Sequence, residues 1–276
     1  RFVPPPIRAR IKPSVESMAA LPSVVIGFIA GLYLAPVVER NLVGVMLLML
    51  VLRIVGTSAM FVWNALPAAV RRRVRIGAEL ILIIPLVILG SWLAFAIAPA
   101  VEGALFGGDA QQWLATTLGI TYDQRNSLVV GLAMGFAVIP IIFTISEDAF
   151  STVPSNLSAA SLALGASRWQ TAIRVVVPTA SPGVFSAIMI GFGRAVGETM
   201  IVLMATGNTP VLDWSIFNGF RTLSANIAVE IPEAPQGGTL YRTLFLSAAL
   251  LFVMTFTLNT VAEVIRQRLR ERYKAI

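Results

Sequence analysis

NSLVVGLAMGFAVIPIIFTI, residues 126–145, is a run of twenty residues that contains no charged side chain. A helix of about 20 apolar residues is long enough to cross the hydrocarbon core of a bilayer, so this run predicts a transmembrane helix. Five further apolar stretches lie on either side of it, at residues 21–38, 41–67, 76–101, 182–207 and 243–264. The sequence therefore predicts an all-α membrane protein, a polytopic helical bundle of about six transmembrane helices.

The composition of the 276-residue chain supports the same fold class. Apolar residues make up 57% of the chain, charged residues 13%, and the mean hydropathy is +0.81. Ordinary globular domains are about 25% charged. The chain has no cysteine and no histidine, which excludes disulfide scaffolds, cysteine–histidine zinc sites, thiol nucleophiles and histidine-based triads. We therefore predict neither a catalytic residue nor a metal site.

The basic residues are unevenly distributed among the predicted connections. If the amino terminus is cytoplasmic, fifteen of the 21 lysines and arginines lie inside and four outside, as the positive-inside rule requires. This predicts two cytoplasmic termini, with residues 1–20 as a cytoplasmic or interfacial segment and residues 265–276 as a basic tail. Topology thus explains the net charge of +7, and no nucleic-acid partner is predicted. The inside basic residues are Arg1, Arg8, Arg10, Lys12, Arg71, Arg72, Arg73, Arg75, Arg168, Arg174, Arg266, Arg268, Arg270, Arg272 and Lys274.

The inside connection at residues 146–181 carries the signals of two short helices. The first helix is expected to start at Ser155 and to end at Gly165, because glycine readily adopts the left-handed conformation that follows many helices. Residues 167–170 have the spacing of a capping box for the second helix, which we expect to end at Pro178. Spacing alone predicts a helix–turn–helix at the membrane surface, a motif with many uses.

The residues of this connection resemble a known family. The connection resembles the EAA loop of ABC importer permeases in three places: Ala159-Ala160-Ser161, Gly165 and Val175-x-Val177-Pro178. The family pattern is Glu-Ala-Ala, glycine, and Ile-x-Leu-Pro, so Ala159 stands where the family has glutamate, and valines replace isoleucine and leucine. In that family the loop forms a coupling helix that docks into a cytoplasmic ATPase. The resemblance implies an ATPase-coupling loop formed by Ala159, Ala160, Ser161, Gly165, Trp169 and Pro178.

Motifs elsewhere in the chain narrow the resemblance. The chain is similar to the permeases of the phosphate-specific transport (Pst) system in three further runs. These are Leu21-Pro22-Ser23-Val24-Val25, Ser146-Glu147-Asp148-Ala149 and Gly193-Arg194-Ala195-Val196-Gly197-Glu198-Thr199. Residues 221–228 make the chain most similar to the PstC-type subunit. Residues 40–120 match least, so we expect a longer variant whose amino-terminal part is missing. The resemblance implies that residues 21–276 form an ABC transmembrane type-1 domain, the fold of type I importer permeases.

The resemblance implies a permease subunit of an ATP-driven importer of inorganic phosphate, a multi-pass protein of the bacterial inner membrane and not an enzyme. No cofactor is expected on this chain, because ATP and Mg²⁺ bind the ATPase subunits. The implied partners are a second permease subunit, two cytoplasmic ATPases, a periplasmic phosphate-binding protein and membrane lipid.

Three alternative functions remain open at this point. The first is a secondary transporter or channel for an oxyanion that works without ATP, and the second is an ABC permease for sulfate or molybdate. The third is an intramembrane enzyme, for which Glu198 and Asp148 are the candidate acids.

Charged residues also fall within the predicted spans. Arg194 and Glu198 are four residues apart on the fifth span, which places them on the same helical face. They either neutralise one another or line and gate the substrate path, where a guanidinium suits phosphate; the resemblance favours the path. Arg53 has no acidic residue on its own span. We expect it to pair with Glu79 or with a carbonyl of another element, or else the span must shift.

Pairs of glycines four residues apart occur in three predicted spans. These are Gly27 and Gly31, Gly131 and Gly135, and Gly193 and Gly197. In apolar spans this spacing allows two helices to approach closely, so we predict helix packing at each pair.

Overall fold

The computed structural model of the chain describes residues 5–65 and 79–274, and the secondary structure of these residues is helical, without a strand. Within them, five helical stretches are long and apolar enough to cross a membrane: Ser23–Arg40, Ile83–Leu118, Ser127–Ser151, Arg168–Gly197 and Thr239–Glu271. A sixth helix, α4 (Leu42–Ala65), has a shorter apolar section, Leu42–Ser58. The predicted all-α, polytopic membrane fold is confirmed.

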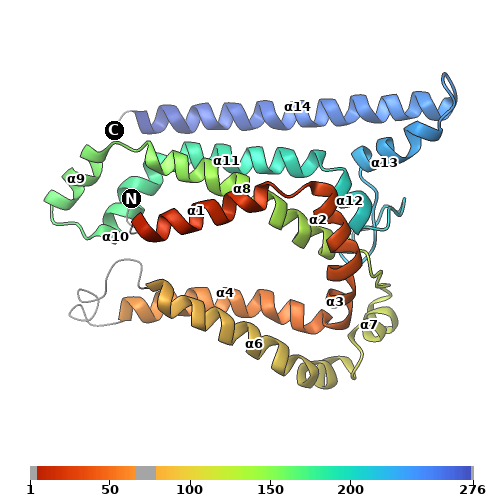
Figure 1. Ribbon diagram of the computed structural model, residues 1–276, viewed down its shortest axis with the longest axis horizontal. Coiled ribbons are helices and arrows are strands. Elements are labelled where there is room, and N and C mark those ends of the chain that lie inside the picture. Colours follow the sequence, from red (N-terminus) through yellow and green to blue (C-terminus); the bar gives the residue numbers. More distant parts are fainter. Residues whose placement is uncertain (1–4, 66–78, 275–276) are drawn as a thin grey trace.

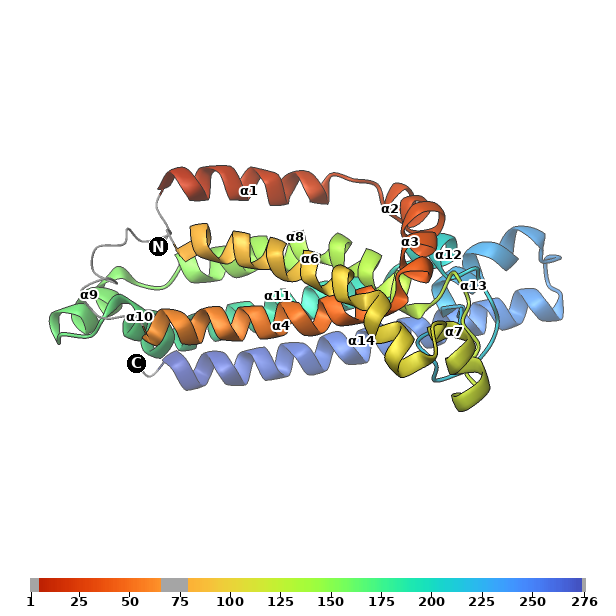
Figure 2. The same ribbon diagram turned by 90° about the horizontal axis from the view of Figure 1, so that it is seen from below.

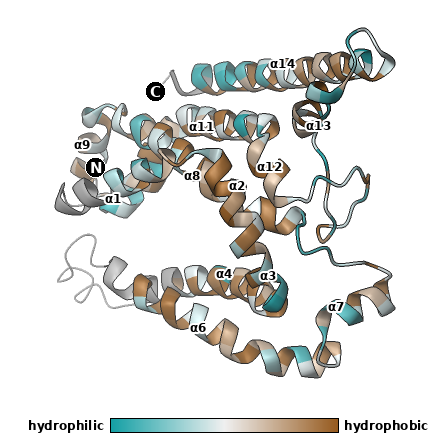
Figure 3. Cartoon of the chain, turned by 45° about the vertical axis from the view of Figure 1, so that its right-hand side comes forward, coloured by the Kyte–Doolittle hydropathy of each residue, from teal (hydrophilic) through white to brown (hydrophobic). Residues whose placement is uncertain are grey.

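Four helices run side by side along the long axis of the molecule (Figures 1 and 2). They are α1 (Pro5–Ala19), α8 (Ser127–Ser151), α11 (Val177–Gly197) and α14 (Thr239–Lys274). Helix α8 packs against α1 and α11, and α11 packs in turn against α14. The last turns of α14, at residues 265–274, are hydrophilic (Figure 3), so the predicted basic tail continues the helix of the preceding span.

The two ends of this bundle carry different short elements. One end, here called the inner end, holds α9 (Ser155–Ala163) and α10 (Arg168–Thr171) together with the start of α1 and the finish of α14 (Figures 1 and 2). The other, here called the outer end, holds α7 (Ala110–Trp113), α12 (Met200–Ala205) and α13 (Leu223–Glu230).

The stretch Ser23–Arg40 is helical throughout but runs across the direction of the four long helices (Figures 1 and 2). It consists of α2 (Ser23–Ile29), a π-helical turn (Ala30–Leu34) and α3 (Ala35–Arg40). Helix α2 lies against α12 at the outer end. This orientation depends on a close approach of two backbones, which the glycines of α2 and of the π-helical turn permit.

The predicted packing role of the glycine pairs is confirmed for one pair only. A Cβ atom on Gly27 would lie 2.9 Å from the Cα atom of Ile201, and a Cβ atom on Gly31 only 2.5 Å from the carbonyl oxygen of Met204. Added Cβ atoms on Gly131, Gly135 and Gly197 would meet no atom of the described residues within 4 Å, and one on Gly193 would meet only Asn259 Oδ1, at 3.4 Å. Within the described residues no other helix approaches the two remaining pairs as closely, since spacing does not specify which helix, if any, faces a glycine.

We expect Gly31→Val to destabilise the chain. Its new Cβ would overlap the Met204 carbonyl, and a backbone atom cannot be moved aside by a rotamer change. Overpacking of this kind costs about 1–3 kcal/mol of stability. We expect a lower Tm when thermal unfolding in detergent is followed by tryptophan fluorescence. The matched variant is Gly135→Val on α8, where the added side chain meets open space. Equal losses of Tm in the two variants would contradict the packing assignment.

Helices α4 and α6 (Glu79–Phe106) form a hairpin that lies apart from the α8–α11 layer (Figure 1). The two helices pack closely: an added Cβ on Gly90 of α6 would lie 2.9 Å from Val55 Cγ2 and 3.0 Å from Val51 Cγ1 of α4. The hairpin joins the bundle at the outer end. There Gln111 Nε2 donates to the carbonyl of Glu39 at 2.9 Å, and Gln124 Nε2 donates to Glu39 Oε2 at 2.5 Å.

Arg53 lies on the side of α4 that is turned away from α6, because Val51 and Val55, two residues to either side, face α6. Its side chain is exposed, and it makes no hydrogen bond or ion pair with any residue that the structure describes. The expected pairing of Arg53 with another element is therefore not found there. The side chain of Glu79 and the inside basic cluster Arg71, Arg72, Arg73 and Arg75 lie outside the described residues.

Candidate functional site

The inner connection folds as two helices around a tight turn. Helix α9 ends at Ala163, and Gly165 has φ +85°, in the left-handed region that favours glycine. The Gly165 N–H donates to the carbonyl of Leu162 at 3.0 Å, which closes the last turn of the helix. The predicted stop at Gly165 is confirmed.

The second helix begins with the predicted capping box. The Gln170 N–H donates to Ser167 Oγ at 3.2 Å, and the Ser167 N–H donates to Gln170 Oε1 at 2.8 Å. Two N–H groups that have no partner inside the helix are thereby satisfied. The capping box is confirmed, and it fixes the point at which the chain leaves the glycine turn.

The surface of this turn is apolar and exposed. Leu164 is 90% exposed and Trp169 is 56% exposed, one on each side of Gly165. Of the other predicted loop residues, Ala159 and Ala160 are also exposed. Ser161 is half-buried, because its hydroxyl lies 3.0 Å from that of Thr171 and ties the two helices together.

Pro178 does not end the second helix, and this prediction is wrong. Helical structure is continuous over Arg168–Gly197, thirty residues or about 45 Å. A wide π-helical turn, Ala172–Val176, immediately precedes the proline region of α11. Proline lacks an N–H and its ring crowds the carbonyl four residues earlier, and a π-helical turn relieves both conflicts. Thr179 Oγ1 also donates to the carbonyl of Val175 at 2.7 Å. The capped turn is thus joined to α11 by one uninterrupted helix.

The predicted span 182–207 is interrupted, so its treatment as one helix is also wrong. Helix α11 ends at Gly197, Glu198 is extended with ψ 129°, and a new helix, α12, begins at Met200. Polar groups that the interruption leaves without a partner inside a helix are hydrogen-bonded elsewhere. The Ile201 N–H donates to Glu198 Oε1 at 3.4 Å, and Ser224 Oγ, from α13, donates to the Glu198 carbonyl at 3.0 Å.

The interruption separates the two charged residues of this span. Arg194 lies in the last turn of α11 and is exposed, whereas Glu198 is half-buried beyond the end of the helix. They therefore do not share a helical face, and no hydrogen bond or ion pair joins them in the described part of the chain. Irregular backbone within a span is tolerated where protein buries it or where it lines a polar cavity, and interrupted helices form the substrate sites of many transporters.

Asp148 and Glu198, the acids of the enzyme alternative, lie at opposite ends of the bundle. Asp148 belongs to the inner end of α8, and Glu198 follows the outer end of α11. Near Asp148, Lys12 Nζ of α1 lies 2.9 Å from Glu147 Oε2. The hydrogen bond that Lys12 donates to the Glu147 carboxylate raises the pKa of Lys12. Glu147 thus fastens α1 to α8, and Asp148 lies too far along the bundle to form a catalytic pair with Glu198.

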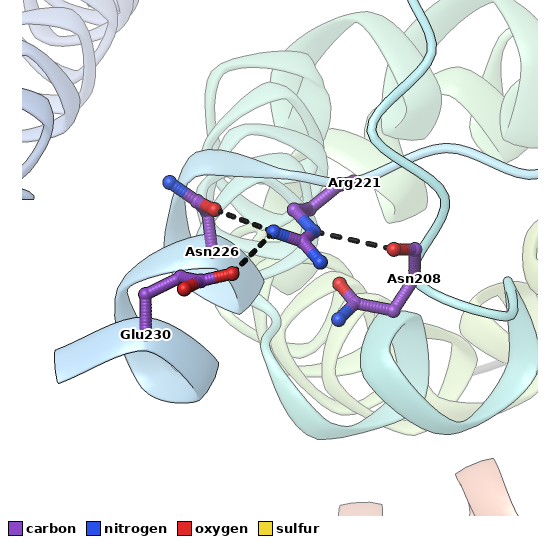
Figure 4. A network of polar contacts seen from close by, with 4 residues as sticks. All are labelled: Asn208, Arg221, Asn226 and Glu230. Atoms are coloured by element: carbon purple, nitrogen blue, oxygen red, sulfur yellow. Dashed lines mark hydrogen bonds and ion pairs between the residues drawn. The ribbon is translucent and has the colours of Figure 1, made fainter. Parts of the chain in front are cut away.

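Residues of the outer loop that the sequence did not mark as functional meet the interruption. Ser224 contacts Glu198 directly. Arg221, which the sequence marked only as part of the run similar to the PstC-type subunit, makes two hydrogen bonds to α13 and one to the Asn208 carbonyl (Figure 4). No local pattern identifies these contacts, because Ser224 and Glu198 are 26 residues apart.

Known proteins are similar to this chain over most of its length. The family described as "Binding-protein-dependent transport system inner membrane component" matches residues 3–275. The "Phosphate transport system permease protein PstC" of Mesorhizobium japonicum is 31% identical over 78% of this chain and 67% of its own length, and the protein of that name from Xylella fastidiosa strain 9a5c is likewise 31% identical over the same shares. The "Probable ABC transporter permease protein YqgH" of Bacillus subtilis is 38% identical over 48% of this chain and 43% of its own length. No solved structure matches the chain.

Proposed function

The chain belongs to the family of binding-protein-dependent transport system inner membrane components, and we propose from this premise that it is a permease subunit of an ATP-driven importer of inorganic phosphate. It is a transport component of the bacterial inner membrane. The assignment of phosphate as the substrate rests on the relatives that are named as phosphate permeases. The chain itself holds no nucleotide in this proposal, and ATP and Mg²⁺ bind partner subunits.

One observation carries the mechanism. A continuous helix, Arg168–Gly197, joins the capped turn at the inner end to the interrupted span at the outer end. A displacement of the turn can therefore be transmitted along this helix to the residues beside Glu198. This is the connection that an ATP-driven importer needs between its motor and its substrate path.

The coupling surface is formed by Leu164 and Trp169 with the small residues of α9, Ala159 and Ala160. Leu164 and Trp169 are large apolar side chains held in water by a rigid turn, as expected of a surface that docks into a partner. We assign this surface to a cytoplasmic ATPase subunit. Gly165 shapes the turn, Ser161 ties its two helices together, and Pro178 sets the π-helical turn that leads into α11.

The substrate path is assigned to the interruption of the fifth span. Arg194 offers a guanidinium that can bind phosphate through two parallel hydrogen bonds, and Glu198 provides a nearby negative charge that keeps such binding weak enough for release. The remaining partners are a second permease subunit, which completes the path, a second ATPase, and a periplasmic phosphate-binding protein at the outer loops. Both termini are assigned to the cytoplasm, since the basic residues concentrate there.

The decisive experiment is uptake of radiolabelled phosphate by the full complex in proteoliposomes, with the binding protein outside and ATP supplied to the ATPase side. We expect uptake that requires ATP and that excess sulfate does not reduce. Uptake without ATP would replace the importer with a secondary carrier or channel. ATP hydrolysis stimulated only by another oxyanion and its binding protein would keep the family and overturn the substrate.

A further inference from the structure

Arg221 connects three parts of the outer loop through one side chain (Figure 4). Its Nε donates to the carbonyl of Asn208 at 3.2 Å, and its Nη1 donates to Asn226 Oδ1 at 3.0 Å and to Glu230 Oε1 at 2.8 Å. The side chain of Arg221 is 20% exposed and that of Glu230 is 30% exposed. A pair this far removed from solvent is worth more than a surface pair, because water and salt screen it less.

The carbonyl that Arg221 binds belongs to the turn at which α12 leaves the bundle. Asn208 has φ +56°, an unusual conformation for a residue other than glycine, and its N–H donates to Thr206 Oγ1 at 3.1 Å. Thr206 is fully buried. The exit of α12 is therefore fixed on one side by a buried threonine and on the other by the Arg221 guanidinium.

The helix that Arg221 binds on its other side reaches the interrupted span. Asn226 and Glu230 belong to α13, whose Ser224 donates to the Glu198 carbonyl at 3.0 Å. The next residue, Ala225, is fully buried in the same apolar core as Ile201 and Val202 of α12. Helix α13 thus returns from the outer loop into the protein and supplies the partner that the end of α11 lacks.

We propose that Arg221 is a positioning residue for transport: it holds α13 against the interruption at Glu198 and thereby fixes the geometry of the substrate path. The inference rests on the function proposed above for Arg194 and Glu198. A planar guanidinium can donate in three directions from one fixed fork, whereas the ammonium of lysine cannot reproduce that geometry. Charge alone is therefore insufficient at this position.

Loss of the Arg221 contacts frees α13 to move away from the break. The Glu198 carbonyl then loses the Ser224 hydroxyl, and the backbone on which Glu198 stands is no longer held. Turnover of the transporter falls, because the path is no longer set in one geometry. Arg221 itself offers little surface to a partner protein, since most of its side chain is buried.

A thiol probe tests the position of α13 without any transport. The chain has no cysteine, so Ala225→Cys introduces its only thiol. In the assembled complex we expect this thiol to resist a membrane-impermeant maleimide, and to react at least tenfold faster when Arg221→Gln or Arg221→Lys is added. Arg242→Gln is the matched control, since it removes an exposed outer arginine. A thiol introduced in place of Leu212, which is fully exposed, should react equally in every background.

Uptake by the same complexes tests the role in transport. We expect Arg221→Gln and Arg221→Lys to lower the maximal rate at least tenfold at an unchanged half-saturating concentration of the loaded binding protein. Ser224→Ala removes only a hydroxyl and should lower the maximal rate in the same direction, which guards against misfolding as the cause. Arg242→Gln should retain the wild-type rate.

Several results would overturn the proposal. In the labelling experiment, such a result would be a thiol of Ala225→Cys that stays protected when Arg221→Gln is added. In the uptake experiment, it would be full uptake by Arg221→Lys or an equal loss of uptake in Arg242→Gln. A change in the half-saturating concentration of the binding protein at an unchanged maximal rate would also overturn it. If the wild-type complex took up no phosphate while the thiol still became reactive, the substrate assignment would fail and the positioning of α13 by Arg221 would stand.

Discussion

Gly165→Pro is expected to lower phosphate uptake at least tenfold, while the transmembrane helices remain inserted. The native φ of Gly165 is +85°, whereas proline is fixed near −65°, so the turn between α9 and α10 cannot form. Proline also removes the N–H that donates to the Leu162 carbonyl. Leu164 and Trp169 would then no longer share one surface, and the ATPase would lose its grip on the helix that leads to the substrate path.

ATP hydrolysis should persist in the Gly165→Pro complex, because the variant lies outside the subunits to which we assign ATP. Uptake and hydrolysis are measured together in proteoliposomes, and their ratio should collapse. Gly165→Ala is the matched control. An added Cβ there meets no atom within 4 Å, and the left-handed conformation costs alanine only about 1–2 kcal/mol, so most of the uptake should remain. Normal uptake by Gly165→Pro would refute the coupling role of this turn.

Arg194→Gln is expected to lower phosphate uptake about tenfold or more without releasing the ATPase subunits. Glutamine cannot supply the positive charge or the parallel pair of N–H donors, and hydrogen bonds to charged groups are worth about 1.5–3 kcal/mol each. Arg194 makes no ion pair among the described residues. Its replacement therefore breaks no ion pair there, and a loss of uptake would not come from a carboxylate left unpaired. Uptake and co-purification of the ATPase are the two measurements.

Arg53→Gln is the matched variant for Arg194→Gln. It also removes an arginine from within a predicted span, but from the hairpin of α4 and α6, away from the interruption of the fifth span. Its uptake is expected to stay near that of the wild type. If the two variants lost equal activity, or if Arg194→Gln were fully active, the assignment of Arg194 to the path would be withdrawn.

Features that depend on neighbours within a few residues were predictable from the sequence. The apolar stretches specify helices because the backbone must satisfy its own hydrogen bonds in a bilayer. The turn at Gly165 and the capping box of Ser167 and Gln170 are confirmed for a similar reason: every atom involved lies within about one helical turn. The motifs that resemble phosphate permeases likewise led to the family, since they are local runs of sequence.

Features that depend on distant contacts were decided only by the tertiary structure. Pro178 permits a continuous helix because the preceding residues widen into a π-helical turn. The fifth span breaks at Glu198 because Ser224, brought there by α13 and held by Arg221, satisfies the freed carbonyl. The segment with Gly31 runs across the bundle because the backbone of α12 lies against it. A proline, a glycine or a carbonyl has the same local chemistry everywhere, and its structural effect is set by which distant group packing places beside it.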